Sequence, residues 1–161
     1  MFIKTKNKRD KLVNLANVSN IHIDEGSSGK IIFNMNYSVK IFNNKTTPDY
    51  VYWEFNSQEE KEEQTMIFLP HLVNMGWITP FDEGQRYVNS ACISSIGFDE
   101  CKNRVIFNLN YNVTHPKDPN KLTSDFVFFN FSSEKKYTAF VDAMLGNTSE
   151  EENNKNEGEF A

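Results

Sequence analysis

The chain has 161 residues, of which 39% are hydrophobic and 14% aromatic, so it can bury a core without disulfides or metals and is not disordered over most of its length. Its formal charge of −5 is uneven, because the last fourteen residues hold five Glu against one Lys. The remaining body is close to neutral, so charge neither identifies nor excludes a polyanionic partner. No apolar run approaches the roughly 18 residues that span a bilayer, and no apolar leader follows the basic start, so we expect a cytoplasmic protein with no membrane contact.

Taken in chain order, the segments before residue 75 recur after it. FIKT at 2–5 aligns with WITP at 77–80, and VNLANVSNIHID at 13–24 aligns with VNSACISSIGFD at 88–99, both at a shift of 75 residues. IIFNMNYSV and VIFNLNYNV then align at a shift of 74, and DYVYWEFNS and DFVFFNFSS at a shift of 76. Because the shift changes only in predicted turns, the pattern is typical of a tandem duplication.

Each copy contains four extended segments followed by a helix. The segments at 31–39 and 105–113 alternate apolar and polar residues, which predicts strands with one buried face. The segments at 49–57 and 125–133 are apolar on both faces, so we expect strands that are central in a sheet or that meet the other copy. The segments at 13–24 and 88–99 end at Asp24 and Asp99. A turn after each Asp leads into the alternating strand, which predicts a hairpin in each copy.

Capping signals place a helix at the end of each copy. Ser57 with Glu60 forms a capping box, and Ser133 is the equivalent N-cap in the second copy. The first helix is expected to end before Pro70 or to kink there, and Gly146 is expected to end the second. The apolar stripe of the second helix consists of Tyr137, Phe140, Val141 and Met144.

The expected fold class is therefore α+β, a tandem duplication of a ββββα unit with antiparallel sheets that forms an intramolecular pseudo-dimer. Residues 1–75 would be the first repeat, residues 76–147 the second, and residues 148–161 a disordered acidic tail. Cys92 and Cys101 have no counterpart in the first copy, which favours free thiols over a bridge and an intracellular setting.

The sequence offers no catalytic or metal-ligating arrangement. His22, His71 and His115 are isolated, and no metal-ligand, nucleophile or phosphate-loop spacing surrounds them. We therefore expect a protein that is not an enzyme and needs no metal or cofactor.

Several side chains suit single-stranded nucleic acid. Asparagine amides on the polar strand face offer donors and acceptors to base edges, the aromatic rings of the following strand offer stacking surfaces, and the basic N-terminal run can contact phosphates. The candidate nucleic-acid-binding residues are Lys4, Lys6, Lys8, Arg9, Asn34, Asn36, Tyr50, Tyr52, Asn108, Asn110, Phe126 and Phe128. The alternative is that the asparagines are hydrated strand positions, the aromatics pack between the repeats, and the lysines keep an edge strand soluble.

The acidic tail is a second candidate site. Its Glu157, Glu159 and Phe160 resemble the tails of bacterial and phage single-stranded-DNA-binding proteins, which partner enzymes read, although here Ala161 follows the aromatic residue. That resemblance implies a partner-binding tail, and the alternative is a solubilising terminus.

The duplicated ββββα order resembles the topology shared by the PC4 coactivator, the PUR proteins and the plant Whirly proteins. The resemblance covers architecture only, and it implies single-stranded DNA or RNA binding on a curved sheet surface, with the copies paired through their helices. The second hypothesis is a protein-protein interaction module, such as a phage- or plasmid-type accessory or inhibitor protein. The expected partner is thus a single-stranded nucleic acid or a protein, and homo-oligomerisation stays open.

Overall fold

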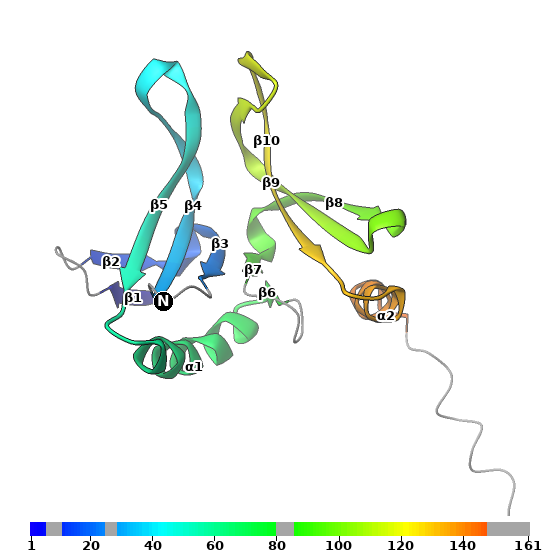
Figure 1. The fold of residues 1–161 in the computed structure, drawn as a ribbon, viewed down its shortest axis with the longest axis horizontal. Helices are drawn as coiled ribbons and strands as arrows, with labels where there is room; N and C mark the ends of the chain where they lie inside the picture. Colours follow the sequence, from blue (N-terminus) through cyan, green and yellow to red (C-terminus); the bar gives the residue numbers. More distant parts are fainter. Residues whose placement is uncertain (6–10, 25–28, 80–85, 148–161) are drawn as a thin grey trace, which may run out of the picture.

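The protein has a mixed α+β architecture in the computed structural model, which describes residues 1–5, 11–24, 29–79 and 86–147 (Figure 1). The elements up to the first helix are β1 (Phe2–Thr5), β2 (Lys11–Asn14), β3 (Val18–Ile23), β4 (Lys30–Lys40), β5 (Thr46–Glu54) and α1 (Gln58–Asn74). The elements that follow are β6 (Trp77–Ile78), β7 (Arg86–Asn89), β8 (Ile93–Asp99), β9 (Arg104–His115), β10 (Asp118–Asn130) and α2 (Glu134–Leu145). The predicted acidic tail lies outside the described residues.

The described strands form three sheets, and every pairing within them is antiparallel. The largest has the order β5-β4-β3-β7-β6, the second has the order β10-β9-β8, and β1 pairs with β2 in a separate hairpin. The first sheet therefore takes its last two strands from beyond residue 75, where we expected one repeat to end. Backbone hydrogen bonds between β3 and β7 cross that boundary.

The alternating pattern of β4 and β9 predicted their buried faces. Ile31, Phe33 and Met35 are buried on β4, and the equivalent residues of β9 are buried as well. The pattern fails at Tyr37, which is 45% exposed, whereas its counterpart Tyr111 is 8% exposed. Alternation identifies the face but not how far the neighbouring elements cover it.

The second predicted strand of each copy is interrupted by a 3-10 turn, so the described residues of each half form five strands instead of the expected four. The turns are Leu15–Asn17 and Ser90–Cys92. Each begins at an asparagine whose side chain accepts a hydrogen bond from the second backbone N–H of the turn, Asn14 from Ala16 at 3.2 Å and Asn89 from Ala91 at 3.1 Å. This Asx interaction offers the backbone an alternative to the sheet ladder, and the chain changes direction there.

Strands β5 and β10 lie at the edges of their sheets, so the expected central position is wrong. Each is the second strand of a long hairpin with β4 or β9, whose other side is already occupied by β3 or β8. The other expectation, contact with the opposite half, holds at one end of the hairpins, where the Thr46 backbone N–H donates to Thr114 Oγ1 at 2.7 Å.

Both helices begin as the capping residues predicted. Ser57 Oγ accepts from the Glu60 N–H at 3.1 Å, and Ser133 Oγ accepts from the Lys136 N–H at 3.3 Å. α1 does not end before Pro70 but continues to Asn74. Pro70 is exposed, so its ring and the carbonyl that it leaves without a partner lie on the solvent side, where water can bond that carbonyl.

Each helix packs on the apolar face of one sheet. Phe68 of α1 lies 6.4 Å from Phe33, and Phe140 of α2 lies 5.8 Å from Phe129, both measured between ring centroids. Two hydrophobic cores result, one in each half. The resemblance had implied that the two copies pair through their helices. The helices instead lie apart (Figure 1), and the pairing of β3 with β7 joins the halves.

The cysteines are free, as expected. Cys92 is buried and Cys101 is exposed.

Candidate ligand-binding surface

Two exposed aromatic pairs lie on the sheet faces that the helices leave open. Tyr50 and Tyr52 stack on β5 with ring centroids 6.2 Å apart and an interplanar angle of 28°, and Phe126 and Phe128 stack on β10 at 6.2 Å and 25°. The i, i+2 spacing places both members of a pair on one strand face. These four side chains are 36–57% exposed. The four rings are therefore exposed to solvent, and Phe126 also lines the cleft between the two sheets.

A cation lies at the same end of each pair. Lys30 Nζ is 5.4 Å from the Tyr52 ring centroid, and Arg104 Cζ is 4.3 Å from that of Phe128. Lys30 also forms an ion pair with Glu54 at 3.6 Å, and Arg104 Nε donates to Asn130 Oδ1 at 2.7 Å. The register of each hairpin creates this arrangement, because it sets Lys30 opposite Glu54 and Arg104 opposite Asn130. Both surfaces therefore combine stacking rings with a positive charge.

Two of the candidate asparagines are bound to the neighbouring strand. Asn34 Nδ2 donates to Asn20 Oδ1 at 2.9 Å, and Asn108 Nδ2 donates to Ser95 Oγ at 3.0 Å. These bonds fix the amide planes and commit one donor of each amide to the protein, which reduces what Asn34 and Asn108 can offer to a base edge.

The other two asparagines differ from each other. Asn36 hydrogen-bonds to the buried Cys92 thiol of the second half. Burial raises the pKa of that thiol, and the hydrogen bond from Asn36 offsets only part of the rise. Asn36 thus belongs to the contact between the halves. Asn110 is exposed on β9.

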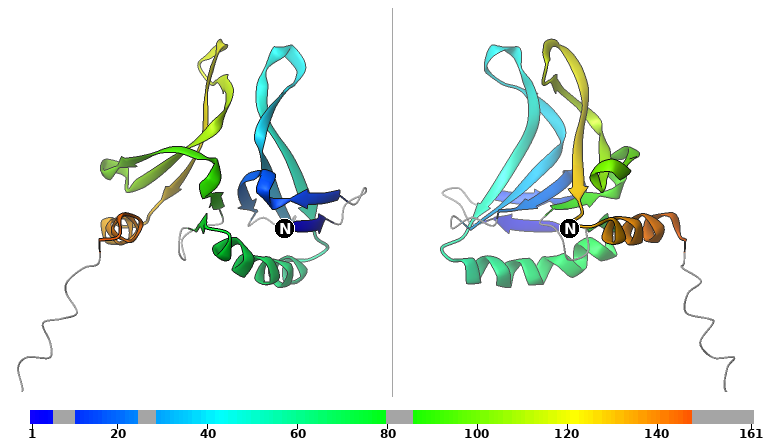
Figure 2. Two further views of the ribbon diagram at one scale, coloured as in Figure 1. Left: turned by 180° about the vertical axis from the view of Figure 1, so that it is seen from behind. Right: turned by 45° about the vertical axis from the view of Figure 1, so that its right-hand side comes forward.

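A cleft of about 280 Å³ lies between the two sheets and joins residues from both halves. Asn20, His22, Ile32 and Asn34 line it from the first sheet, Arg86 from β7, and Asp125, Phe126 and Val127 from β10. It thereby brings together Asn34 and Phe126, two sequence candidates that are far apart in the chain. Figures 1 and 2 show the two long hairpins rising on either side of the β3–β7 base.

A buried hydrogen-bond chain fixes Asp125 at the side of the cleft. The Tyr111 hydroxyl donates to Asp125 Oδ2 at 2.6 Å and lies 3.3 Å from Ser19 Oγ in the first half. Burial raises the pKa of Tyr111, and the hydrogen bond to Asp125 raises it further. The cleft consequently carries one basic side chain, Arg86, beside one acidic side chain, Asp125.

Sequence reasoning missed Asn20, His22 and Asp125 as cleft residues, and it pointed to Arg86 only as an extension of the basic N-terminal run. Asn20 and His22 meet Arg86 in the cleft because β3 pairs with β7, with His22 opposite Arg86. Asp125 reaches the cleft from β10 of the other sheet. The repeat alignment does not predict the pairing of β3 with β7, because they are not equivalent strands of the two copies and do not follow one another in the chain.

Of the basic N-terminal candidates, the structure describes only Lys4. Lys4 belongs to the separate β1–β2 hairpin, and Lys6, Lys8 and Arg9 lie outside the described residues. The tail candidates Glu157, Glu159 and Phe160 also lie outside them.

Within the described part of the chain, no cluster of three or more His, Cys, Asp or Glu could hold a metal ion. Neither described helix combines the length and apolar character that crossing a membrane requires. Comparison of the chain with protein-family models, curated proteins and solved structures found no match.

Proposed function

We propose that the chain arose by tandem duplication of one unit, with repeats at 1–75 and 76–147, and that the halves form an intramolecular pseudo-dimer. Equivalent contacts in the two halves support this origin. The asparagine-capped turns recur, as do the serine-capped helices. The first hairpins have equivalent registers, Phe2 opposite Asn14 and Trp77 opposite Asn89.

We further propose that the protein is a non-enzymatic, cytoplasmic protein that binds single-stranded DNA or RNA on the open sheet faces. The observation that carries this proposal is the recurrence of an exposed aromatic pair beside a cation in both halves. Stacking of a base on an aromatic ring is worth about 1–3 kcal/mol and tolerates any base, and a cation at the end of the pair can meet the phosphate that follows. The cleft between the pairs supplies amide groups and Arg86 to the same strand.

The test is a fluorescence-anisotropy titration of labelled oligo-dT at low and moderate salt. The full chain and a chain ending at residue 147 should both bind, and binding should weaken as salt rises. Tyr52→Ala and Phe128→Ala should each weaken binding by about 1–3 kcal/mol. Phe42→Ala is the matched control, because Phe42 is 88% exposed but lies at a hairpin tip, away from both pairs. Absence of binding by the shortened chain at low salt would refute the proposal.

A protein-interaction module is the second candidate, and the carboxylates favour it. Asp125 lines the cleft, and Glu54 already neutralises Lys30, so negative charge stands where a phosphate would approach. The affinity of a protein partner that docks on the same aromatics would depend much less on salt concentration. Binding through phosphate contacts always weakens as the salt concentration rises. The dependence of the binding affinity on salt concentration therefore distinguishes the two functions for any ligand that is found.

A further inference from the structure

The β6–β7 hairpin packs on both hydrophobic cores. Ile78 and Val88 contact the core of the second half, to which the hairpin belongs by sequence. Trp77 and Tyr87 pack on the core of the first half, and Trp77 is only 5% exposed. One face of the hairpin thus packs on the core of its own half, and the other face packs on the core of the opposite half.

The β1–β2 hairpin is the counterpart of β6–β7, but one of its faces is uncovered. Ile3 and Val13, the equivalents of Ile78 and Val88, are buried in the core of the first half. Phe2 and Leu12, the equivalents of Trp77 and Tyr87, are 64% and 70% exposed. Two large apolar side chains therefore point into solvent at the positions that, in the other hairpin, cover the opposite half.

The strand that such a hairpin should pair with also has an open edge. β3 lies between β4 and β7, whereas its counterpart β8 has β9 on one side and, among the described strands, none on the other. Ile21 and Ile23 of β3 are 0% and 8% exposed. At the matching positions of β8, Ile96 is half-buried and Phe98 is 44% exposed.

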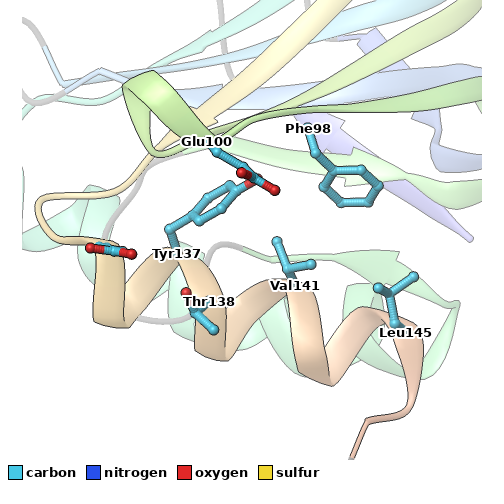
Figure 3. Close-up of a pocket in the computed structure, with 7 residues that line it drawn as sticks. Phe98, Glu100, Tyr137, Thr138, Val141 and Leu145 are labelled. Carbon is cyan, nitrogen blue, oxygen red and sulfur yellow. The ribbon is translucent and has the colours of Figure 1, made fainter.

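Next to this edge, β8 and α2 enclose a groove of about 440 Å³ (Figure 3). Phe98, Tyr137, Val141 and Leu145 line it with apolar groups, and Glu100 and Glu134 add carboxylates to the lining. In the first half the corresponding region is occupied by β6, which contacts α1 and inserts Trp77 into the core.

We propose that the occupant is the β1–β2 hairpin of a second copy of this chain. Its β2 adds to β8 in the register that β7 uses on β3, where Ile21 lies opposite Tyr87 and His22 opposite Arg86. Transferred to the second half, this register sets Leu12 of the incoming copy opposite Ile96 and Lys11 opposite Gly97. Phe2 then lies in the groove as Trp77 does in the first half.

Charge and hydrogen bonding complement this arrangement. The incoming hairpin carries Lys4 and Lys11, and the lining of the groove carries Glu100 and Glu134. Within the chain, Asn89 Nδ2 donates to the Val18 carbonyl at 2.9 Å across the halves. Asn14 of the incoming copy is placed to make the equivalent bond to the carbonyl of Ile93.

The occupant is a second copy because the chain's own β1–β2 hairpin is engaged elsewhere. It packs on the first core, and Figures 1 and 2 show it on the side of the molecule opposite β8. The contact joins a hairpin of one copy to a strand edge of another, so its repetition gives a pair of copies that exchange hairpins, a larger ring or an open chain.

Cross-linking of two different chains tests the register, each with one introduced cysteine besides the buried Cys92. One chain carries Lys11→Cys and the other Gly97→Cys, both with Cys101→Ser to remove the exposed thiol. Gly97 has room for the new side chain, since an added Cβ would lie 3.9 Å from Ile106 Cβ, an ordinary van der Waals contact. A mixture of the two should give a disulfide-linked heterodimer under mild oxidation, and a mixture of Gly97→Cys with Lys40→Cys should not.

Failure of the specific pair to link above the Lys40→Cys control overturns the proposal. The same holds if one chain with both changes forms the disulfide within itself, because β2 would then pair with β8 of its own chain.

Light scattering across a concentration series provides the second measurement. The native chain should associate, and the variant with Phe2→Asp and Leu12→Asp should dissociate at least about tenfold more readily. At a concentration too low for either chain to associate, both should melt at the same temperature, since both side chains are exposed in the single copy. Ile41→Asp with Phe42→Asp is the matched control, with two exposed apolar residues at a hairpin tip, and should associate like the native chain. A native chain that stays monomeric, or two variants that behave alike, overturns the proposal.

Discussion

Replacing Tyr111 by phenylalanine tests a buried hydroxyl of the second half that also contacts the first half. The change removes one oxygen atom, which donates to Asp125 Oδ2 at 2.6 Å and lies 3.3 Å from Ser19 Oγ. Tyr111 is only 8% exposed, so water cannot easily replace the hydroxyl. Hydrogen bonds to charged groups contribute about 1.5–3 kcal/mol, and Asp125 can be partly rehydrated from the cleft, so we expect a loss of about 1.5–2 kcal/mol in the free energy of unfolding.

Tyr37→Phe is the control for this change because it removes the equivalent hydroxyl. Tyr37 donates to Asp49 Oδ2 at 2.9 Å, but its side chain is 45% exposed, so water replaces the lost bond at a cost of about 0.5 kcal/mol or less. Urea unfolding followed by tryptophan fluorescence measures both variants against the native chain. If Tyr37→Phe costs as much as Tyr111→Phe, burial of the Tyr111 hydroxyl does not strengthen its hydrogen bonds as argued.

Three further predictions concern stability. Because burial and Asp125 raise the pKa of Tyr111, its stabilising effect should be complete below the unfolded pKa of about 10 and decline as the pH rises beyond it, so the urea midpoint should fall with alkaline pH less steeply in Tyr111→Phe than in the native chain. Phe107→Ala should cost about 3–5 kcal/mol in thermal or urea unfolding because Phe107 is fully buried, and a loss below that of the half-exposed Ile106→Ala would contradict the assigned core. Pro70→Ala should raise the melting temperature, since proline costs up to about 3 kcal/mol inside a helix, and a lower value would mean that the exposed ring supports the fold.

Local patterns in the sequence were enough to place most strands and both helices. Strand alternation depends on the geometry of the strand itself, and capping by Ser57 and Ser133 depends on residues within one turn. The same local rules assign Tyr37 and Tyr111 one environment, because their surroundings in sequence are nearly identical. They differ in burial because Tyr111 meets Ser19 from the other half, a contact between residues 92 positions apart.

The candidate surface was predictable in its chemistry but not in its assembly. Period-two spacing identified both aromatic pairs, and their exposure agrees with it. The cations at their ends depend on hairpin register, and the cleft depends on β3 pairing with β7. Register between distant strands is set by which faces can be buried together, and a repeat alignment does not contain that information.

The double role of the β6–β7 hairpin also governs how the chain can be built. During synthesis, α1 is complete at Asn74, yet the first core still lacks Trp77 and Tyr87 at that moment. The ribosome must therefore release the segment through Asn89 before the N-terminal core can be completed. A polypeptide that ends at residue 75 would lack Trp77 and Tyr87, so its core would stay partly exposed. Melting should accordingly occur as one cooperative event across both halves, with no stage at which either survives by itself.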